Sequence, residues 1–414
     1  MRLVRLEFVR GMAAVTVWLS HVLHLSEARN HLGVGALLLS WAGTAVIIFF
    51  LLSGIVIRLS YDRSPRSRVE FIRDRAIRIL PLYYVAVLIG VAVEAILIGL
   101  PSGWTVVGHI FFAQSGDRHI CPWLWGNGPL WSLTYEVFFY LVFAGTIGRS
   151  QRRFVACWAV GAIAAIGLQV LVPPTGSGRF VVSLVGYSGI WLLGYYAVDL
   201  IRAIRVDSWT AAAWAALIPM AARVELPGLI DPAGSDILTA CVATPLFIHI
   251  LQTDLQRPCP VNQLGIGSFA VAYLSLCGLT IFSSSSLPSS KVVYATVPLA
   301  ACLPFLLGSK LSVWPPRLTS VSLFLGRISY ALYVIHFPIM RLADTLPAGF
   351  WVRAACYLCA SFVAAILLED YFQRSVVRWL RGRAPMRAPS DTHAGSYFGL
   401  ESRTAGLAAR SLES

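Results

Sequence analysis

A histidine lies inside the first strongly apolar segment of the chain. His21 follows Arg10 by eleven residues, and the stretch between them is mostly apolar. Eleven helical residues span roughly 16 Å, so with Arg10 at one interface His21 would lie about halfway or further across a hydrocarbon core of about 30 Å. Ionisable groups in a bilayer usually face a cavity or a partner. His21 is therefore a candidate general base; the alternative is a histidine bonded to a neighbouring helix or close to the far interface.

A carboxylate lies in a second apolar stretch. Glu136 falls within residues 131–140, an aromatic-rich run that follows a long predicted external loop and should open a helix at the outer side. That position predicts a depth comparable with that of His21, so a His–Glu pair is geometrically allowed. Such a pair fixes the tautomer of an imidazole and raises its basicity. The alternative is two unrelated buried residues, each paired locally.

Two arginines with a spacing of three residues begin the third apolar segment. Arg75 and Arg78 would lie on one face of a helix at the membrane boundary. Two guanidinium groups in this position suit a polyphosphate, which they bind by bidentate hydrogen bonds. Arg10, at the inner end of the first segment, would belong to the same basic mouth. Juxtamembrane arginines that bind anionic lipid would have the same spacing, so this alternative stays open.

The composition predicts the membrane elements that must position these groups. Of the 414 residues, 57% are hydrophobic and 13% are charged, which excludes a soluble globular protein. We expect an all-α polytopic integral membrane protein, a bundle of about 10–12 transmembrane helices. The candidate spans lie near residues 10–26, 36–58, 79–100, 131–148, 154–172, 181–200, 209–222, 236–251, 264–282, 292–309, 321–341 and 350–371. Segments 209–222 and 236–251 are short, so re-entrant or strongly tilted helices are alternatives there.

The formal net charge of +13 follows the predicted topology and does not indicate a nucleic-acid surface. Arginines gather before the first span, between the second and third, and after the last, whereas the alternating loops hold few. This alternation matches the positive-inside pattern and predicts that both termini are cytoplasmic. The basic N-terminal segment is predicted to be a retained first helix, because the charged residues 25–29 make a poor signal-peptidase site.

The chain divides into one long apolar part and a short polar tail. Residues 1–383 are predicted to form a single membrane-embedded domain, and residues 384–414 a disordered cytoplasmic tail. The loop 101–130 is rich in Gly, Pro and Trp and is predicted to lie along the outer interface, although its aromatic rings would also suit a sugar. The eight cysteines are scattered, and Cys356 and Cys359 have no second pair nearby, so no metal site is expected.

Five short motifs, in order along the chain, resemble those of the acyltransferase family 3 membrane O-acyltransferases. The matching segments are Arg10-Gly11 with His21, residues 49–54 (FFLLSG), Arg75 with Arg78 and Pro81, residues 129–136 (PLWSLTYE) and residues 325–336 (LGRISYALYVIH). The resemblance covers nearly the whole hydrophobic chain. Val137 and Ile47 stand where many members carry an acidic residue, and these departures bear on the acceptor pocket.

The resemblance implies an acyl-CoA-dependent membrane O-acyltransferase. It would transfer an acyl group, usually acetyl, to a hydroxyl of a surface or exported glycan or of another exported molecule. Acyl-CoA would be a co-substrate whose phosphates are held by Arg75, Arg78 and Arg10, and no bound cofactor is expected.

The catalytic roles implied by the resemblance fall on the two buried ionisable groups. His21 would act as general base with Glu136 orienting it, or it would carry a transient acyl group. Ser53, in the second-helix motif, and His336, in the late motif, are secondary candidates. His336 would line the same cavity or would have a packing role.

The expected location is the bacterial cytoplasmic (inner) membrane, as a multi-pass protein. The expected partners are acyl-CoA, a glycan or other hydroxyl acceptor and the lipid bilayer, without nucleic acid. A transporter or flippase of a lipid-linked saccharide is the competing class, since it would also use buried ionisable groups. Against a carrier, the two halves show no evident inverted repeat. A scaffold without its own activity would fit the composition but not the motifs.

Overall fold

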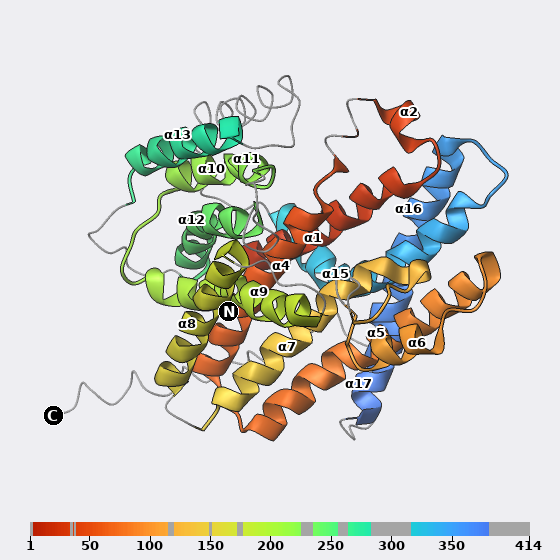
Figure 1. The fold of residues 1–414 in the computed structure, drawn as a ribbon, viewed down its shortest axis with the longest axis horizontal. Coiled ribbons are helices and arrows are strands. Elements are labelled where there is room, and N and C mark those ends of the chain that lie inside the picture. The colour runs from red at the N-terminus through yellow and green to blue at the C-terminus, as the bar shows by residue number, and fades with distance from the viewer. Residues whose placement is uncertain are drawn as a thin grey trace.

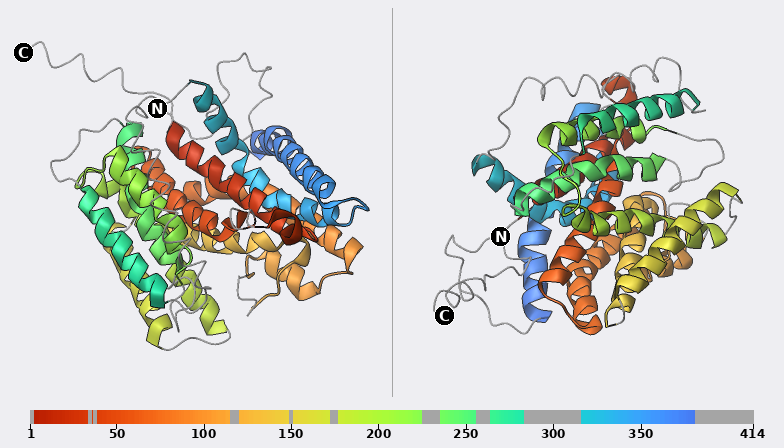
Figure 2. Two further views of the ribbon diagram at one scale, coloured as in Figure 1. Left: turned by 90° about the horizontal axis from the view of Figure 1, so that it is seen from above. Right: turned by 90° about the vertical axis from the view of Figure 1, so that its left-hand side faces the viewer.

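The computed structural model describes residues 3–33, 36, 39–114, 120–148, 151–171, 177–224, 235–255, 264–282 and 316–380. Within these ranges every regular element is a helix, which confirms the predicted all-α fold. The helices pack into one bundle, as Figures 1 and 2 show. The predicted tail, residues 384–414, and the predicted span 292–309 lie outside the described residues.

The element order follows the apolar segments of the sequence. The N-terminal part contains α1 (Val4–Ser20), the 3-10 turn η1 (His21–His24), α2 (Ala28–Leu32), α4 (Ala42–Arg63), α5 (Arg68–Leu97), α6 (Gly103–Ile110), the 3-10 turn η2 (Trp125–Leu130) and α7 (Trp131–Thr146). The chain continues with α8 (Gln151–Leu171), α9 (Ser177–Leu200), α10 (Ser208–Ala216), α11 (Ile218–Ala221), α12 (Ser235–Leu255) and α13 (Ile266–Phe282). It ends with α15 (Pro316–Asp344), α16 (Phe350–Leu367), the π-helical η3 (Leu368–Gln373) and α17 (Arg374–Leu380).

Each predicted span within the described ranges coincides with a helix or a pair of helices. Seven described helices are long and apolar enough to cross a membrane, and the total of 10–12 stays a prediction. Segment 236–251, which looked short, belongs to the 21-residue α12. Segment 209–222 is instead divided between α10 and α11, and Pro219 lies in the first turn of α11, where its missing N–H leaves no helical hydrogen bond unmade.

Helices α1 and α15 pack closely and run parallel. At one end Arg10 donates to the Gly326 carbonyl at 2.9 Å, and at the other the rings of His21 and His336 lie 4.7 Å apart. The spacings of eleven and ten residues between these contacts match only if the helices run in the same direction. A Cβ at Gly326 would come within 2.9 Å of the Glu7 carbonyl oxygen, so the approach depends on a small residue. Figure 2 shows the two helices side by side.

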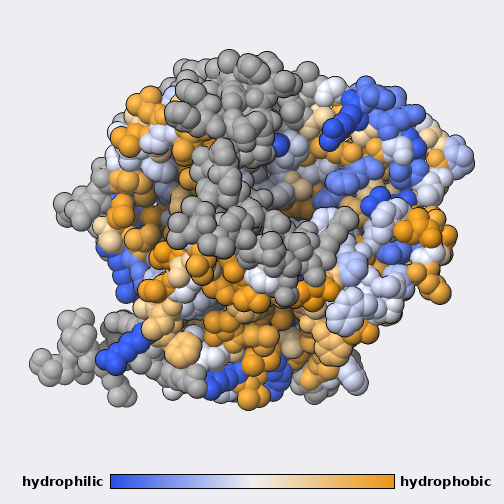
Figure 3. Space-filling view, viewed as in Figure 1, coloured by the Kyte–Doolittle hydropathy of each residue, from blue (hydrophilic) through white to orange (hydrophobic). Residues whose placement is uncertain are grey.

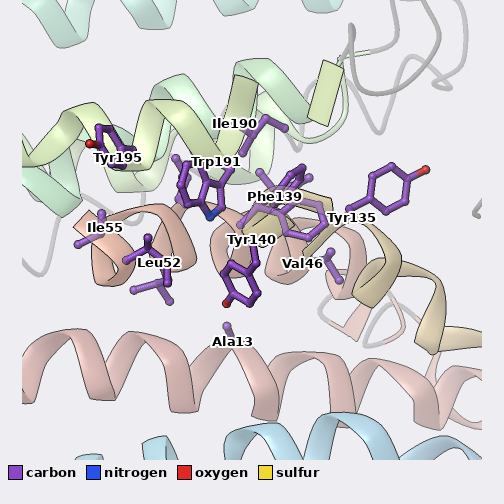
Figure 4. Packing of buried hydrophobic residues seen from close by; sticks show 14 of the residues in the cluster. Ala13, Val46, Leu52, Ile55, Tyr135, Phe139, Tyr140, Ile190, Trp191 and Tyr195 are labelled. Atoms are coloured by element: carbon purple, nitrogen blue, oxygen red, sulfur yellow. The ribbon is translucent and has the colours of Figure 1, made fainter. Parts of the chain in front are cut away.

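A second close pair, α4 with α9, is covered by an aromatic core. Gly54 and Gly194 each lie against the backbone of the other helix, where a Cβ would overlap a carbonyl oxygen. The ring of Trp191 on α9 packs near Phe139 of α7, with centroids 6.2 Å apart. Figure 4 shows this buried cluster and shows Tyr140 pointing away from it toward α1. Packing on one side of α7 therefore directs Tyr140 toward the interior between α4 and α1.

The connection that precedes α7 is fixed to the bundle by buried polar contacts. The Glu94 carboxylate accepts the Gly126 N–H at 3.0 Å. The Asn127 amide donates to the carbonyl oxygens of Ala86 at 3.2 Å and Val334 at 2.9 Å. Because Ala86 is on α5 and Val334 on α15, the start of α7 is held at a fixed depth relative to both helices.

His109 of α6 supports the same connection. Its Nδ1 lies 2.8 Å from the Thr105 carbonyl oxygen, and the Leu124 N–H donates to its Nε2 at 3.4 Å. Because a carbonyl only accepts, the proton of the neutral ring is on Nδ1. Burial lowers the pKa of His109, and the hydrogen bond to Thr105 opposes this shift only in part. The ring is therefore neutral near pH 7 and serves as an acceptor for the loop.

On one face of the molecule, hydrophobic residues lie between hydrophilic ones. Figure 3 shows hydrophilic residues at the upper right, near α2 and the start of α16, and along the lower edge, with hydrophobic residues between them. Large apolar side chains are exposed on the long helices, among them Leu88 and Ile96 of α5 and Val363 of α16. Exposure on this scale suits lipid and not water. Together with the seven long apolar helices, it identifies a multi-pass membrane protein.

Gly54→Ala is expected to destabilise the bundle, because the added methyl group would overlap the Trp191 carbonyl oxygen and push α4 away from α9. Overpacking of this kind costs about 1–3 kcal/mol. The midpoint of thermal unfolding in detergent should therefore fall. Gly43→Ala, on the same helix with no atom within 4 Å of the added methyl group, is the control and should not lower the midpoint. Equal midpoints for Gly54→Ala and wild type would contradict the packing.

Candidate functional site

His21 lies where α1 gives way to the tighter turn η1. Its side chain is 8% exposed. Nδ1 of the ring lies 2.7 Å from the Val17 carbonyl oxygen and 3.2 Å from Nε2 of His336 on α15. The structure therefore brings together two residues nominated from the sequence, the first candidate base and a secondary candidate.

The hydrogen bonds assign a tautomer to both imidazoles. A carbonyl oxygen only accepts, so the Nδ1 of His21 is protonated, and so is the Nδ1 of His336, which lies 3.0 Å from the Leu332 carbonyl oxygen. In its neutral form His336 then offers an unprotonated Nε2 to His21. Neutral His21 also has an unprotonated Nε2, which no hydrogen bond of the described residues occupies. Nε2 of His21 is thus the atom that is free to take a proton.

Further side chains surround the two imidazoles at this end of the bundle. His24 stacks on His21 with ring centroids 4.9 Å apart, and Phe337 meets these two rings edge-on at 5.8 and 5.2 Å. His24 is exposed, whereas His21 is buried. The guanidinium carbon of Arg341 lies 4.9 Å from the centroid of Phe337. The candidate base is therefore one ring below the molecular surface.

Glu136 belongs to a different polar group. Its carboxylate accepts the hydroxyl of Tyr140, one turn later on α7. The Tyr140 hydroxyl lies 3.0 Å from Oγ of Ser53 on α4, and the indole N–H of Trp191 donates to Ser53 at 3.2 Å. Ser53, nominated from the second-helix motif, is thus linked to Glu136 through one tyrosine, the residue that Figure 4 shows pointing toward α1.

The expected contact between His21 and Glu136 is not formed, since their hydrogen bonds within the described chain go to other residues. The depth of α7 explains this. Ser132, in its first turn, bonds to the hydroxyl of Tyr333 at 2.6 Å, and Tyr333 is one turn before His336 on α15. Glu136 is one turn further along α7, so its carboxylate is about 10 Å deeper than the imidazoles. Ser132 and Tyr333 occupy the interval.

The arginines nominated from the sequence lie toward the opposite end of the bundle, and two of them are ion-paired. Arg78 pairs with Glu369 of η3 at 2.6 Å, and the Glu369 side chain is 2% exposed. Arg10 pairs with Glu7, one turn earlier on α1. These carboxylates compensate much of the positive charge at this end.

Arg75 has no carboxylate partner among the described residues. Its guanidinium carbon lies 5.9 Å from the ring centroids of both Phe71 and Tyr140, and its Nε is buried without a hydrogen bond. Its charge acts on the nearby Glu136, whose carboxylate is held by Tyr140. A guanidinium held by rings and not by a carboxylate keeps its hydrogen-bond donors for an incoming anion.

Three residues of this arrangement were missed in the sequence. His24 is three residues after His21, a spacing that puts two side chains on one face of a helix and could have indicated it. Glu369 interrupts the last apolar segment beside Asp370, which could have marked partners for inner arginines. Arg341 ends the apolar run after His336 and has the appearance of an ordinary boundary arginine, so no local signal distinguishes it.

Arg78→Gln is expected to destabilise the protein, because it leaves the buried carboxylate of Glu369 without compensation. Breaking a buried ion pair in this way costs about 3–5 kcal/mol. The midpoint of thermal unfolding in detergent should fall, and Arg78→Gln/Glu369→Gln should recover most of the loss. Arg75→Gln, on the same helix without an ion pair, is the control and should keep the wild-type midpoint. A wild-type midpoint for Arg78→Gln would show that the ion pair contributes nothing.

All the site residues described above lie within the part of the chain that matches one protein-family model. Residues 3–370 match a model described as an acyltransferase domain, from the start of α1 to η3. No solved structure is significantly similar to the chain.

Three known proteins are similar to the chain over different lengths. The exopolysaccharide production protein ExoZ of Rhizobium meliloti is 35% identical over 126 residues, which is 28% of this chain and 36% of that protein. Nodulation protein 10 of Rhizobium leguminosarum bv. viciae is 30% identical over 189 residues, 40% of this chain and 50% of that protein. The acyltransferase MdmB of Streptomyces mycarofaciens is 26% identical over 413 residues, 94% of this chain and 96% of that protein. The chain thus spans half or less of the first two relatives.

Proposed function

Because the chain belongs to acyltransferase family 3, we propose that it transfers an acyl group, acetyl in the simplest case, from cytoplasmic acyl-CoA to a hydroxyl of an exported glycan. One relative is named for exopolysaccharide production and another as an acyltransferase, which supports this substrate class. The observation that carries the proposal is the separation of two polar groups in one bundle. Arg75, with no carboxylate partner among the described residues, lies toward one end, and His21, whose Nε2 has no hydrogen bond among them, lies at the other.

The donor would bind at the arginine end, which the positive-inside pattern predicts to be cytoplasmic. Arg75 would make the first contact with a phosphate of CoA, because its donors are not engaged by a carboxylate. Guanidinium groups bind phosphate through two parallel hydrogen bonds, which favours arginine over lysine here. Arg78 and Arg10 would add positive charge from their positions beside Glu369 and Glu7.

His21 would act as general base at the other end. Its Nε2 removes the proton of the acceptor hydroxyl while that oxygen attacks the thioester carbonyl carbon. The C–S bond then breaks, CoA leaves as a thiolate, and the proton on Nε2 returns to the thiolate. Throughout, Nδ1–H stays between the Val17 carbonyl and Nε2 of His336, which keeps the ring oriented and stabilises its positive charge. The geometry also suits a transient acyl group on Nε2.

Glu136 would assist through its charge and not through a hydrogen bond to His21. At a separation of about 10 Å and an effective dielectric constant of about 20, a carboxylate stabilises an imidazolium by roughly 1.7 kcal/mol. This is the size of about a tenfold change in rate. The positive charges of Arg75, Arg78 and Arg10 oppose this effect, because they lie within reach of the same carboxylate.

His21→Ala should abolish acyl transfer, because it removes the proton acceptor. The measurement is label transfer and CoA release by the purified protein in detergent, with radiolabelled acetyl-CoA and a glycan acceptor. Membrane insertion should be retained, since the loss of a polar group from a span favours insertion. His31→Ala, which changes a partly exposed histidine on α2, is the control and should stay active. Full acyl transfer by His21→Ala would refute the assignment of His21 as general base. If the wild-type protein releases no CoA, the result would favour a flippase.

Glu136→Gln should lower kcat about tenfold, a smaller loss than that of His21→Ala, because it removes a distant charge and keeps an acceptor for Tyr140. Steady-state kinetics with both substrates test this. If His21 and Glu136 act as a unit, the double variant should be no slower than His21→Ala. A loss in Glu136→Gln as large as that in His21→Ala would contradict action at a distance.

Arg75→Ala should raise the KM for the acyl donor and leave that for the acceptor unchanged. Contacts to a charged group contribute about 1.5–3 kcal/mol, or roughly ten- to a hundredfold in affinity. Arg75→Lys should restore part of the affinity, because an ammonium cannot form the bidentate contact. Arg73→Ala, at an exposed position of the same helix, is the control. Complete rescue by lysine with no shift in donor KM would indicate lipid binding instead.

A further inference from the structure

A second guanidinium lies beside the candidate base and has no role in the chemistry above. Arg341 is on α15, four residues after Phe337 and five after His336. Its guanidinium carbon lies 4.0 Å from the ring centroid of Trp125, in η2, and 4.9 Å from that of Phe337. Two aromatic rings from different segments therefore hold the position of this guanidinium group.

The charge of Arg341 is not neutralised within the described part of the chain. It makes no ion pair or hydrogen bond there, and its Nε is buried without a partner. The two carboxylates whose charges reach it are engaged elsewhere. Glu94 accepts a loop N–H at 3.0 Å, and Asp344 accepts from the backbone and hydroxyl of Ser26 at 2.7 and 2.8 Å.

Arg341 is also close enough to His21 for its charge to act on that ring. The ring of Phe337 contacts the guanidinium group of Arg341. The centroid of the same ring lies 5.2 Å from that of His21 and 5.8 Å from that of His24. An uncompensated cation at this place opposes the imidazolium that forms when His21 takes a proton. An anion bound by Arg341 during the reaction would cancel that repulsion. Binding of the acceptor would then make it easier for His21 to take up a proton.

We propose that Arg341 binds an oxyanion of the acceptor beside His21, so that the protein selects an acidic acceptor. This inference rests on the proposed acyl transfer and adds the substrate class. The ligand chemistry is a carboxylate or a phosphate, both of which match the planar fork of a guanidinium. A carboxylate would come from an acidic sugar of the glycan, and a phosphate from the pyrophosphate of a lipid-linked saccharide. In either case the hydroxyl to be acylated belongs to the same molecule.

The test compares three acceptors in the detergent assay with saturating acetyl-CoA. They are a glucuronate-containing oligosaccharide, its carboxyl-reduced neutral counterpart, and the neutral saccharide linked to a polyprenyl pyrophosphate. Wild-type protein should show a kcat/KM at least tenfold higher for one of the two anionic acceptors than for the neutral oligosaccharide. The anionic acceptor that is preferred identifies the source of the oxyanion.

Arg341→Gln should remove this preference. Its KM for the preferred anionic acceptor should rise ten- to a hundredfold. The kcat/KM for the neutral oligosaccharide should not fall, because that acceptor has no oxyanion for Arg341 to bind. Arg341→Lys should give an intermediate KM, because lysine keeps the positive charge but cannot form two parallel hydrogen bonds to one oxyanion. Arg29→Gln, which removes an exposed arginine from α2 at the same end, is the matched control and should keep the wild-type preference.

Two results would overturn the proposal. One is a wild-type protein that uses all three acceptors equally, a measurement that needs no variant to fold. The other is an equal loss for anionic and neutral acceptors in Arg341→Gln or Arg341→Lys, which would assign the arginine a structural role. Neither result affects the proposed acyl transfer, whose own failure would appear as wild-type protein that releases no CoA with any acceptor.

Discussion

The parallel contact between α1 and α15 is the constraint on which both polar groups depend. The absence of a side chain at Gly326 lets the helices approach, and one register then places Arg10 on the Gly326 carbonyl and His21 on His336. A slip of one turn, about 5.4 Å, would break both contacts together. The imidazole pair and Arg10 are therefore not independent features, because a single helix pair sets the position of each.

Near each end of this helix pair lies an arginine that packs against aromatic rings, Arg75 of α5 at one end and Arg341 of α15 at the other. Arg75 lies beside the rings of Phe71 and Tyr140, and Arg341 lies near Trp125 and Phe337. Rings position a guanidinium without using its hydrogen-bond donors, whereas a carboxylate would occupy them. The neighbouring pairs Arg78–Glu369 and Arg327–Asp370 show the contrasting arrangement. The described residues thus leave Arg75 and Arg341 without an ion pair, while the arginines beside Arg75 are paired.

Between the two ends, polar side chains are bonded to one another inside an apolar bundle. Ser132 bonds to Tyr333, and Glu136 to Tyr140 and through it to Ser53. Unpaired polar groups at this depth would cost several kcal/mol each, so mutual pairing makes the line of polar residues tolerable. The aromatic core on the other side of α7 keeps this face turned toward α1 (Figure 4). The carboxylate of Glu136 is thereby held by Tyr140 and not by His21.

The sequence by itself determined the all-α membrane architecture, the positions of the described spans and the family, because apolar length and short motifs are local properties. It also nominated His21, Arg75 and Glu136, since an ionisable residue in an apolar run is conspicuous without a structure. Only the tertiary structure decided the partners. His21 meets His336, 315 positions away, and not Glu136, because side-chain depth depends on where α7 enters the bundle. Arg78 meets Glu369 across 291 positions for the same reason: helix packing sets these pairs, and no sequence spacing encodes them.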